Sequence, residues 1–533
     1  MTEPKQMTET ANTAQKHDII IVGAGHNGLI CASYLAMAGR KVLVLEANEE
    51  VGGCSATREF SAGYSVSSAA QWLYQLNPQV FADLKLKAHG LKYAAENLDS
   101  IALDPEGDAH ISLNGSHVSG TGLADGDAAK YEELHAQLLR FVTILDKVFN
   151  RRPPKLVDSD LHDKITLAKL GLGMKMLGKE DMSEMLRVGL MNIYDLLDEH
   201  LETPLLKGAI SLDAVLGTHM GPRSPNTVYT YLYKLLGQHY GFSGHTLVSG
   251  GMGAVSKALA KSAHDLGVEI RTGSAVASID LDADQAVGVT LQSGESLSAK
   301  TIVSNADPKS TFTKLVGLRN VEAGFSRRVQ VIRAKGNAAK LHLALNGLPK
   351  FTGLSATEHG HRLLIAPTMQ YVEKAFNHAK YGEYSSAPAM DISIPTVHDS
   401  SLAGSDKHVL SATIQYSPYQ LKGGWNDEQK AAAKETAINL LCEYAPGLRE
   451  QIVDSEYLSP ADIEAEFNLY GGHWHHGEIS LDQVLMMRPT PGCTQYSTPV
   501  DNLFLCGAGA HPGGGVMGLA GKNAADEIVR QSK

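Results

Sequence analysis

Short hydrophobic runs alternate with an amphipathic stretch near the start of the chain, and the pattern predicts a strand, a helix and a second strand. The apolar run Asp18–Val22 predicts a buried parallel strand, and residues 29–38 have the spacing of a helix closed by Gly39. A second apolar run, Lys41–Leu45, predicts a neighbouring strand that ends at Glu46. This order is typical of an α/β fold with a doubly wound parallel sheet.

The link between the first strand and the helix reads Gly-Ala-Gly-His-Asn-Gly, from Gly23 to Gly28. In this motif Gly23 allows a tight turn, Gly25 lets the backbone approach a pyrophosphate at the helix N-terminus, and Gly28 lets the helix pack closely on the strand. Glu46 lies 18 residues beyond Gly28, near the expected spacing for an acid that accepts hydrogen bonds from ribose hydroxyls. Because its charge would repel a 2′-phosphate, NADP is not expected here.

Further glycines indicate more contacts with the same ligand. Gly52 and Gly53 follow Glu46 and would give the backbone a second close approach to phosphate; this pair resembles the extended signature of FAD enzymes of the glutathione-reductase superfamily. Residues 501–529 repeat the order strand, glycine-rich turn and helix. The four glycines of Gly513–Gly518 make a poor helix interior but leave bare backbone amides that can face a ligand.

A third block lies between these two ends. Residues 249–270 predict a glycine turn, a helix and a short strand, and alternating runs around residues 293–295 predict a hairpin that leads to a strand at Thr301–Asn305. The three blocks, with the sequence DNLFLCGAGAHPGGGVMGLAG from Asp501, resemble the phytoene desaturase family of flavoproteins, which includes carotenoid desaturases, carotenoid isomerases and retinol saturases. The nearest likeness is to the branch named as pyridine nucleotide-disulphide oxidoreductase domain proteins.

This resemblance covers the chain from about residue 17 to the C-terminus. It implies a Rossmann-like FAD-binding domain of the glutathione-reductase and amine-oxidase type, assembled from discontinuous segments, with an inserted α+β substrate domain. It also implies that the C-terminal helix points its positive end at the flavin ring, where it would stabilise the anionic reduced flavin. The disulphide part of the branch name does not fit, because no second cysteine lies within a few residues of Cys54.

The predicted FAD contacts follow from these motifs and from the family resemblance. They are Gly23, Gly25, Asn27, Gly28, Glu46, Gly52, Gly53, Val276, Arg488, Gly507, Gly514, Gly515 and Val516. Noncovalent FAD is expected over attachment through Cys493, which follows a predicted exposed turn at Pro491-Gly492. No second complete dinucleotide motif is present, so oxygen, a quinone or another acceptor is expected to reoxidise the flavin rather than a docked NAD.

Two long insertions separate the cofactor blocks and predict the domain organisation. We expect a disordered leader at residues 1–16. The FAD-binding domain would comprise residues 17–109, 246–320 and 485–533, and the substrate domain would comprise residues 110–245 and 321–484.

Two stretches of the first insertion bear on substrate access. Residues 184–201 are apolar around most of a helix, which predicts a position in the core or against a ligand tunnel. Residues 163–179 carry four lysines among Leu, Ile and Met. At helical spacing these residues give no clean apolar face. Two interpretations are therefore left open: a lid or surface helix, or a segment that contacts an anionic membrane.

Candidate catalytic groups cluster in the loop 470–478. His475, His476 and Glu478 are the candidate proton-handling residues, since histidine titrates near neutral pH and desaturation releases a proton as well as a hydride. A loop that only supports the flavin is the competing interpretation. No metal site is expected, because adjacent histidines in a loop lack the spacing of helix-borne ligands.

Composition narrows the class of protein. The 533 residues carry a net charge of −11, which leaves no excess of Lys and Arg for nucleic acid. The five cysteines are odd in number and give no disulphide framework, which favours a reducing compartment. A polar leader and the lack of a long apolar run predict a cytoplasmic protein. Membrane association and homo-oligomerisation are left open.

Taken with the resemblance, these features predict an FAD-dependent oxidoreductase that acts on carbon–carbon bonds of a lipophilic unsaturated or isoprenoid-like small molecule by desaturation, saturation or isomerisation. A flavin amine oxidase ranks second, because only 6% of residues are aromatic and no paired tyrosines precede the C-terminal motif. A non-enzymatic interaction protein stabilised by FAD is the third interpretation.

Overall fold

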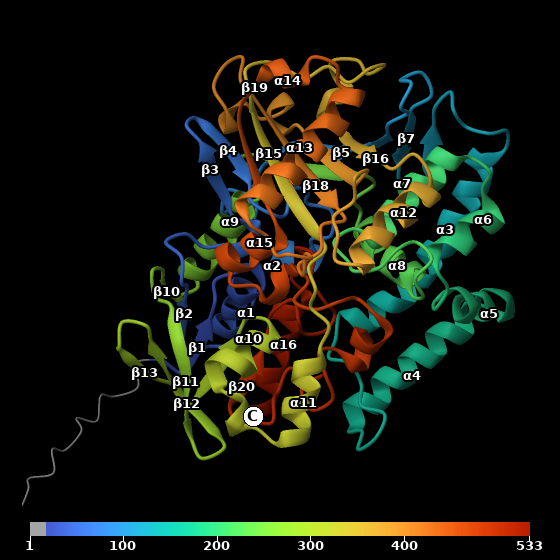
Figure 1. Cartoon of the computed structure of the whole chain (residues 1–533). Coiled ribbons are helices and arrows are strands. Elements are labelled where there is room, and N and C mark those ends of the chain that lie inside the picture. The colour runs from blue at the N-terminus through green and yellow to red at the C-terminus, as the bar shows by residue number, and fades with distance from the viewer. Residues whose placement is uncertain (1–16, 533) are drawn as a thin grey trace, which may run out of the picture.

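The computed structural model describes residues 17–532 and divides into two regions around two large sheets (Figure 1). The leader expected at residues 1–16 lies outside the described residues. No helix in the described part of the chain is both long enough and apolar enough to span a bilayer.

The first region is built on a five-stranded parallel sheet with the order β10-β2-β1-β14-β20. Its central strands are short apolar runs whose side chains are buried on both faces, as expected for parallel strands covered on both sides. The strands are β10 (Glu269–Arg271), β2 (Val42–Leu45), β1 (Ile19–Val22), β14 (Thr301–Ser304) and β20 (Leu503–Leu505).

Helices and a small antiparallel sheet cover this parallel sheet. Helix α1 (His26–Met37) packs against α16 (Leu519–Gln531) and α9 (Gly253–Asp265). The antiparallel strands pack through β12 on β14 and share one hydrophobic core with the helices. These strands are β11 (Val276–Asp282), β12 (Gln285–Leu291) and β13 (Ser296–Ser298), so the hairpin predicted around residues 293–295 is confirmed.

The second region contains an eight-stranded sheet with the order β19-β15-β18-β17-β16-β6-β7-β8. Its neighbours pair antiparallel except for β16 and β6, which run parallel. The strands are β19 (Ile452–Leu458), β15 (Ala338–Leu345), β18 (His408–Gln415), β17 (Ala389–Ser393), β16 (Arg362–Ile365), β6 (Ser100–Ala102), β7 (Ile111–Asn114) and β8 (His117–Ser119).

Two hydrophobic clusters involve this sheet, each with its own helices. One contains residues of α3 (Asp127–Phe149), α6 (Ile193–His200), α7 (Pro204–Val215), α8 (Thr227–His239) and α12 (Met369–Lys380). The other contains residues of α13 (Asp427–Tyr444) and α14 (Leu448–Gln451). The remaining helices are α2 (Pro78–Asp83), α4 (Leu161–Met176), α5 (Lys179–Val188), α10 (Pro308–Ser310), α11 (Ala323–Val331) and α15 (Pro460–Phe467). Two further strand pairs join β3 (Thr57–Ser61) to β4 (Tyr64–Ser67) and β5 (Tyr93–Leu98) to β9 (His245–Val248).

The structure corrects two predicted helices. Helix α1 begins at His26 and not at residue 29, because Gly25 is its N-cap and the second half of the glycine motif forms the first turn. The single buried helix predicted over residues 184–201 is wrong. The chain leaves α5 at Gly189, and α6 starts afresh after the Asn192 cap, whose side chain accepts a hydrogen bond from the amide of Asp195. Only the α6 half has a buried face; α5 lies at the surface.

Two elements, β6 and α11, pack in a different region from the one expected from their position in the sequence. Strand β6 belongs to the eight-stranded sheet although it lies within residues 17–109. Phe325 and Val329 of α11 join the core of the parallel-sheet region although they lie beyond residue 320. Both regions therefore take residues from across the expected boundaries.

Candidate functional site

The N-terminal motif lies at the carboxyl end of β1, and its geometry requires glycine. Gly23 has φ +99°, and its amide donates to the carbonyl of Leu45 at 2.7 Å. A Cβ on Gly25 would lie 2.8 Å from Nδ2 of Asn305, and a Cβ on Gly28 would lie 2.2 Å from the carbonyl oxygen of Gly23. The turn therefore keeps its backbone open to a ligand, as the sequence predicts.

Glu46 ends β2 beside this turn and is buried. Its carboxylate accepts hydrogen bonds from the amide of Ala24 at 2.7 Å and from the amide of Asn48 at 3.0 Å. The amide of Gly52 donates to the carbonyl of Ala24 at 3.0 Å, which brings the second glycine pair against the first motif. The acid is thus held in place by backbone donors that also shape the loop.

A large cavity, of about 1730 Å³ including space open to solvent, runs along these segments, and we call it the cofactor cavity. Its lining includes many of the predicted contacts: Gly23, Gly25, Asn27, Glu46, Gly52, Gly53 and Val276. Four buried polar atoms on its lining residues lack a hydrogen-bond partner within residues 17–532: His26 Nε2, Asn27 Oδ1, Ser310 Oγ and His476 Nδ1. Bare glycine backbone and unpartnered polar atoms fit a dinucleotide with phosphates and hydroxyls.

Some cofactor-cavity residues were not predicted. Asn305 directly follows β14, and Ser310 lies in the short helix α10 that comes next. Their position at the carboxyl end of a strand beside β1 is the signal that could have found them, since ligands bind at that edge of parallel sheets. Phe467 comes from the second insertion, and local sequence contains no comparable signal for it. Trp474 also lines this cavity and belongs to the loop 470–478, which was expected to form a wall of the pocket.

A second cavity of about 1090 Å³, here the substrate cavity, adjoins the first. Three residues line both cavities where they adjoin: His26, Cys54 and Trp474. Gly515 and Val516 of the C-terminal motif line the substrate side. Most of the lining surface of the substrate cavity is apolar, although polar and charged residues also line it. Its other apolar and aromatic lining residues are Ala69, Ala70, Trp72, Tyr74, Ala214, Leu216, Tyr233 and Ile479.

The histidine loop occupies the boundary between the two cavities. His475 lines the substrate cavity and His476 lines the cofactor cavity. Burial holds the pKa of His475 well below its ordinary value and lowers that of His476 to about 4, so both rings are neutral at physiological pH. Nδ1 of His475 is buried and has no hydrogen-bond partner in the described part of the chain.

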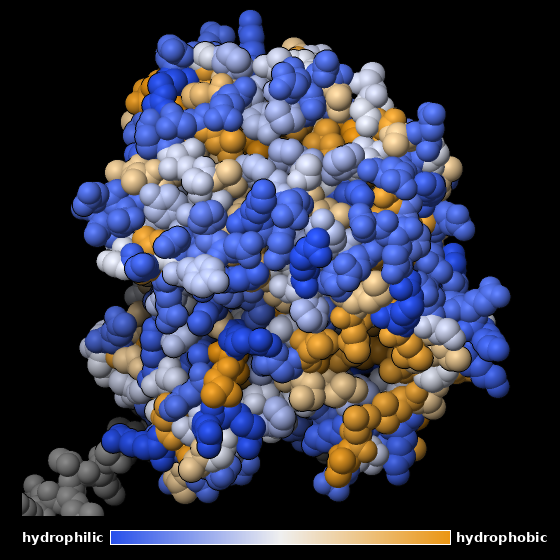
Figure 2. Space-filling view, turned by 45° about the vertical axis from the view of Figure 1, so that its right-hand side comes forward, coloured by the Kyte–Doolittle hydropathy of each residue, from blue (hydrophilic) through white to orange (hydrophobic). Residues whose placement is uncertain are grey.

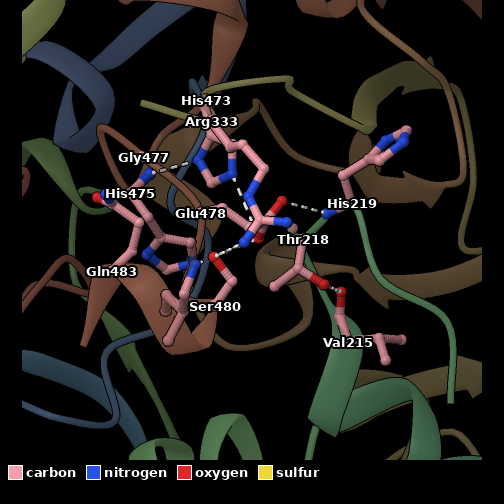
Figure 3. A network of polar contacts seen from close by, with 12 residues as sticks. Val215, Thr218, His219, Arg333, His473, His475, Gly477, Glu478, Ser480 and Gln483 are labelled. Atoms are coloured by element: carbon pink, nitrogen blue, oxygen red, sulfur yellow. Dashed lines mark hydrogen bonds and ion pairs between the residues drawn. The ribbon is translucent and has the colours of Figure 1, made fainter. Parts of the chain in front are cut away.

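Glu478 lines neither cavity and instead lies between His473 and His219 (Figure 3). Its carboxylate lies 3.6 Å from Nε2 of His473 and accepts a hydrogen bond from the amide of His219 at 2.8 Å. Burial alone would raise the pKa of Glu478, but these partners hold it below its ordinary value. The geometry makes Glu478 a positioning residue for the loop.

Arg488 is fully buried and joins the histidine loop to the C-terminal motif. Its guanidinium donates to the carbonyl oxygens of His475 at 2.5 Å and of Ala508 at 2.9 Å. It also donates to the carbonyls of Glu478 and Gln483, at 3.1 and 3.2 Å. Arg488 lines neither cavity, so the structure gives this predicted cofactor contact a positioning role instead.

The remaining predicted cofactor contacts either pack against backbone or lie near residues of the substrate cavity. Gly28 and Gly507 fit against backbone, since a Cβ on Gly507 would lie 2.5 Å from the carbonyl oxygen of Asn305. Gly514 accepts a hydrogen bond at its carbonyl from the Tyr233 hydroxyl at 2.5 Å, and a Cβ there would lie 2.7 Å from Nδ1 of His475. Cys493 is buried in the core, where desolvation raises the pKa of its thiol to about 12.

Four charged residues form a buried charge cluster at the substrate cavity: Asp213, Lys234, Arg362 and Asp391. Arg362 donates to Asp213 at 2.7 Å and to Asp391 at 2.8 Å, and Lys234 also bonds to Asp213. Burial alone would raise the pKa of Asp213, but Arg362 and Lys234 hold it well below its ordinary value. Both carboxylates are therefore already neutralised by cations.

Comparison with known proteins agrees with this geometry. The model of the family described as flavin containing amine oxidoreductase matches residues 28–311. Pyridine nucleotide-disulfide oxidoreductase domain-containing protein 2 of Mus musculus is 33% identical, over 97% of this chain and 94% of that protein. One of the subunits of limonene dehydrogenase from Castellaniella defragrans is 26% identical, over 96% of this chain and 94% of that protein.

A similar fold occurs in a solved structure. Cyclohexylamine oxidase from Brevibacterium oxydans aligns with a TM-score of 0.57 at 17% identity, over 97% of this chain and 99% of that one. The resemblance to the pyridine nucleotide-disulphide oxidoreductase domain branch and the FAD-binding α/β fold are thus confirmed. With a flavin family and a dinucleotide motif at the cavity, the cofactor is FAD.

Proposed function

Because this chain belongs to the family of flavin-containing amine oxidoreductases, we propose that it uses FAD to desaturate, saturate or isomerise carbon–carbon bonds of a largely apolar, unsaturated or isoprenoid-like molecule. Bound FAD supplies a ring that accepts or returns a hydride. The observation that carries the proposal is the substrate cavity, whose lining surface is mostly apolar and which adjoins the cofactor cavity. The name of the related limonene dehydrogenase supports hydrocarbon chemistry.

The residues of the chain would bind, orient and shield the reacting carbons. Gly515 and Val516 bring backbone to the substrate side, and Trp474 lines both cavities where they adjoin. Apolar side chains around the substrate exclude water, which protects a hydride transfer from competing protons. Tyr233 holds the glycine loop in place through its bond to the Gly514 carbonyl.

His475 is the proposed proton acceptor in desaturation. Removal of hydrogen from two adjacent carbons releases a hydride, which bound FAD would accept, and a proton, which needs a base; oxygen or a quinone would be the final electron acceptor. The ring of His475 is neutral and lines the substrate cavity, and its Nδ1 lacks a partner among residues 17–532. Arg488 and Glu478 keep the loop that bears it in place.

Amine oxidation is the second candidate, and the family description favours it. The substrate cavity argues against it, because a protonated amine would need an uncompensated negative charge. Asp213 is bonded to Lys234 and Arg362, while Asp391 is bonded to Arg362, Gln71 and Trp72. Neither carboxylate is left to pair with an ammonium group.

A reducing compartment, with the cytoplasm as the proposed one, agrees with the cysteines. All five are free thiols, three of them buried. Noncovalent FAD is also proposed, since Cys493 lies in the core of the parallel-sheet region.

Anaerobic flavin reduction tests the proposal. The purified yellow protein would be mixed with unsaturated isoprenoid hydrocarbons and alcohols in one series and with primary and polyamines in another, and loss of flavin absorbance would be followed. The first series should bleach the flavin and yield a product that differs by two hydrogens. Bleaching by amines alone would favour amine oxidation, the second candidate function. No bleaching in either series would exclude desaturation and amine oxidation for these compounds. If the dithionite-reduced protein also gave no hydrogenated or isomerised product from the first series, a non-enzymatic role would be favoured.

A further inference from the structure

Half of the most exposed large hydrophobic residues of the described chain lie within residues 156–190 (Figure 2). They belong to α4, α5 and the segments beside them, and Figure 2 shows hydrophobic side chains gathered over this lower right part of the molecule. The members are Leu156, Val157, Leu161, Ile165, Leu172, Met176, Leu186 and Leu190. Such a concentration on one surface marks an interaction site, whereas isolated exposed hydrophobics need no partner.

The four members on α4 form one stripe. With 100° between successive residues of a helix, Leu161, Ile165, Leu172 and Met176 fall within an arc of roughly 60°. Leu172 is 59% exposed and Met176 is 75% exposed. The apolar residues Leu167, Leu170 and Met174 lie away from this stripe and are half-buried, so the helix has no single clean apolar face, although its outer face carries an exposed apolar stripe.

Lysines border this stripe on both sides. On the same helical projection, Lys164 and Lys175 lie along one edge and Lys169 along the other. All three are exposed, and none has an ion-pair partner between residues 17 and 532. An apolar stripe between rows of lysine is the arrangement of a helix that lies in a lipid headgroup layer, with its cations among anionic headgroups.

The inner face of α4 is fixed to the body of the protein. Thr166 and Gly173 are buried, and a Cβ on Gly173 would lie 3.2 Å from Ile144 of α3. Asp163 accepts a hydrogen bond from Gln495 at 2.9 Å and pairs with Arg152 at 3.2 Å. The stripe is therefore held outward by packing, and its exposure does not come from a detached helix.

We propose that the outer face of α4, with the adjoining hydrophobic residues of the α5 segment, docks on the surface of an anionic lipid membrane. The protein carries a net charge of −11, but the three unpaired lysines concentrate positive charge on this face. The face therefore suits anionic headgroups, although the protein as a whole is negatively charged. A second copy fits less well, because a two-fold pair would bring the lysine rows of the two stripes together. The docking does not depend on which substrate the enzyme takes.

Vesicle co-sedimentation of the full-length, FAD-loaded protein tests the docking. Vesicles of phosphatidylcholine with phosphatidylglycerol should carry the protein down, vesicles of phosphatidylcholine alone should carry far less, and added salt should weaken the binding. Changing Lys164, Lys169 and Lys175 together to Gln should weaken binding to anionic vesicles by about tenfold or more. The double change Leu172→Ser and Met176→Ser should have an effect of at least similar size, about tenfold.

Two control variants test whether the loss of vesicle binding is specific to this face. The first control changes the exposed lysines Lys350, Lys374 and Lys422 to Gln, which removes the same charge from other parts of the surface. The second control combines Val331→Ser and Val453→Ser, which removes exposed apolar area elsewhere. Both control variants should bind vesicles like the parent protein. Every variant should keep its flavin absorbance. Absence of binding to anionic vesicles, or equal loss in the controls, overturns the proposal. A dimer in light scattering that Leu172→Ser and Met176→Ser dissociate would assign the face to a second copy instead.

Discussion

The guanidinium of Arg488, which is buried, lies 2.5 Å from the carbonyl oxygen of the half-buried residue His475. The same guanidinium reaches Ala508, so one side chain ties the histidine loop to the C-terminal motif. Because its donors face carbonyl oxygens and no carboxylate, its removal would leave several buried acceptors without partners.

Replacing Arg488 should therefore damage folding as well as flavin binding. We expect Arg488→Met to lower the free energy of unfolding by about 3 kcal/mol or more, since each orphaned buried acceptor costs about 1 kcal/mol or more. Urea denaturation and the ratio of flavin to protein would measure this. Arg140→Met, which breaks the exposed pair with Asp181, is the control and should change neither quantity noticeably. A fully stable, yellow Arg488→Met protein would contradict the role assigned to Arg488.

Glu46 should matter for FAD affinity. Its carboxylate lines the cofactor cavity and is oriented by the amides of Ala24 and Asn48. Loss of two charge-assisted bonds to ribose hydroxyls in Glu46→Ala should weaken FAD binding by on the order of 3 kcal/mol, or about 100-fold in Kd. Titration of the apoprotein by flavin fluorescence measures it. Glu50→Ala, an exposed acid four residues on, should bind FAD normally; equal Kd values for both variants would argue against a ribose contact.

His475 and His476 should differ in effect because they face different cavities. With His475→Gln we expect retained flavin and a turnover reduced by about 10²-fold, since glutamine keeps a polar amide but cannot accept the proton. His476→Gln should act first on flavin retention. Stopped-flow flavin reduction with the identified substrate and flavin content separate the two effects, and exposed His264 serves as the control. Unchanged reduction in His475→Gln would direct the search for the base elsewhere on the cavity wall.

Lys340 should make stability depend on pH. It is fully buried, and its Nζ donates to Gln71 at 2.5 Å and to Thr413 at 3.3 Å. Burial lowers its pKa from 10.5 to about 7, so between these values the folded state binds fewer protons than the unfolded state. Stability from this group therefore rises as the pH increases from about 7 towards 10.5.

Lys340→Met removes the titrating group and should flatten that rise. Urea midpoints at several pH values through this window would show it, with exposed Lys350→Met as the matched control. A rise of the same size in Lys340→Met would mean that another group causes it.

The cofactor half of the site could be predicted because its signals are local. Gly23, Gly25 and Glu46 follow from strand and turn patterns a few residues long, and the parallel strands that position them are continuous apolar runs. That Cys54 and Trp474 meet where the two cavities adjoin could not be predicted in the same way. Trp474 reaches the cavity from more than 400 residues beyond Cys54, so only the packing of two distant insertions brings them together.

Surface and core were also hard to separate from sequence in the first insertion. Residues 184–201 are apolar around most of a helical circumference, but α5 ends at Gly189 and lies at the surface, while α6 has a buried face. Arg488 carries a similar lesson: the family resemblance assigns it to the flavin, whereas its buried donors serve backbone carbonyls that no sequence pattern reveals.

The shared wall of His26, Cys54 and Trp474 has a consequence for the catalytic cycle. Apart from these three residues each cavity has its own lining, so we expect product to leave through the substrate cavity without displacing the residues that line the cofactor cavity. The prosthetic group would then stay with the protein through many rounds of reaction. An assay of this protein would need no added flavin, and dilution would not inactivate it.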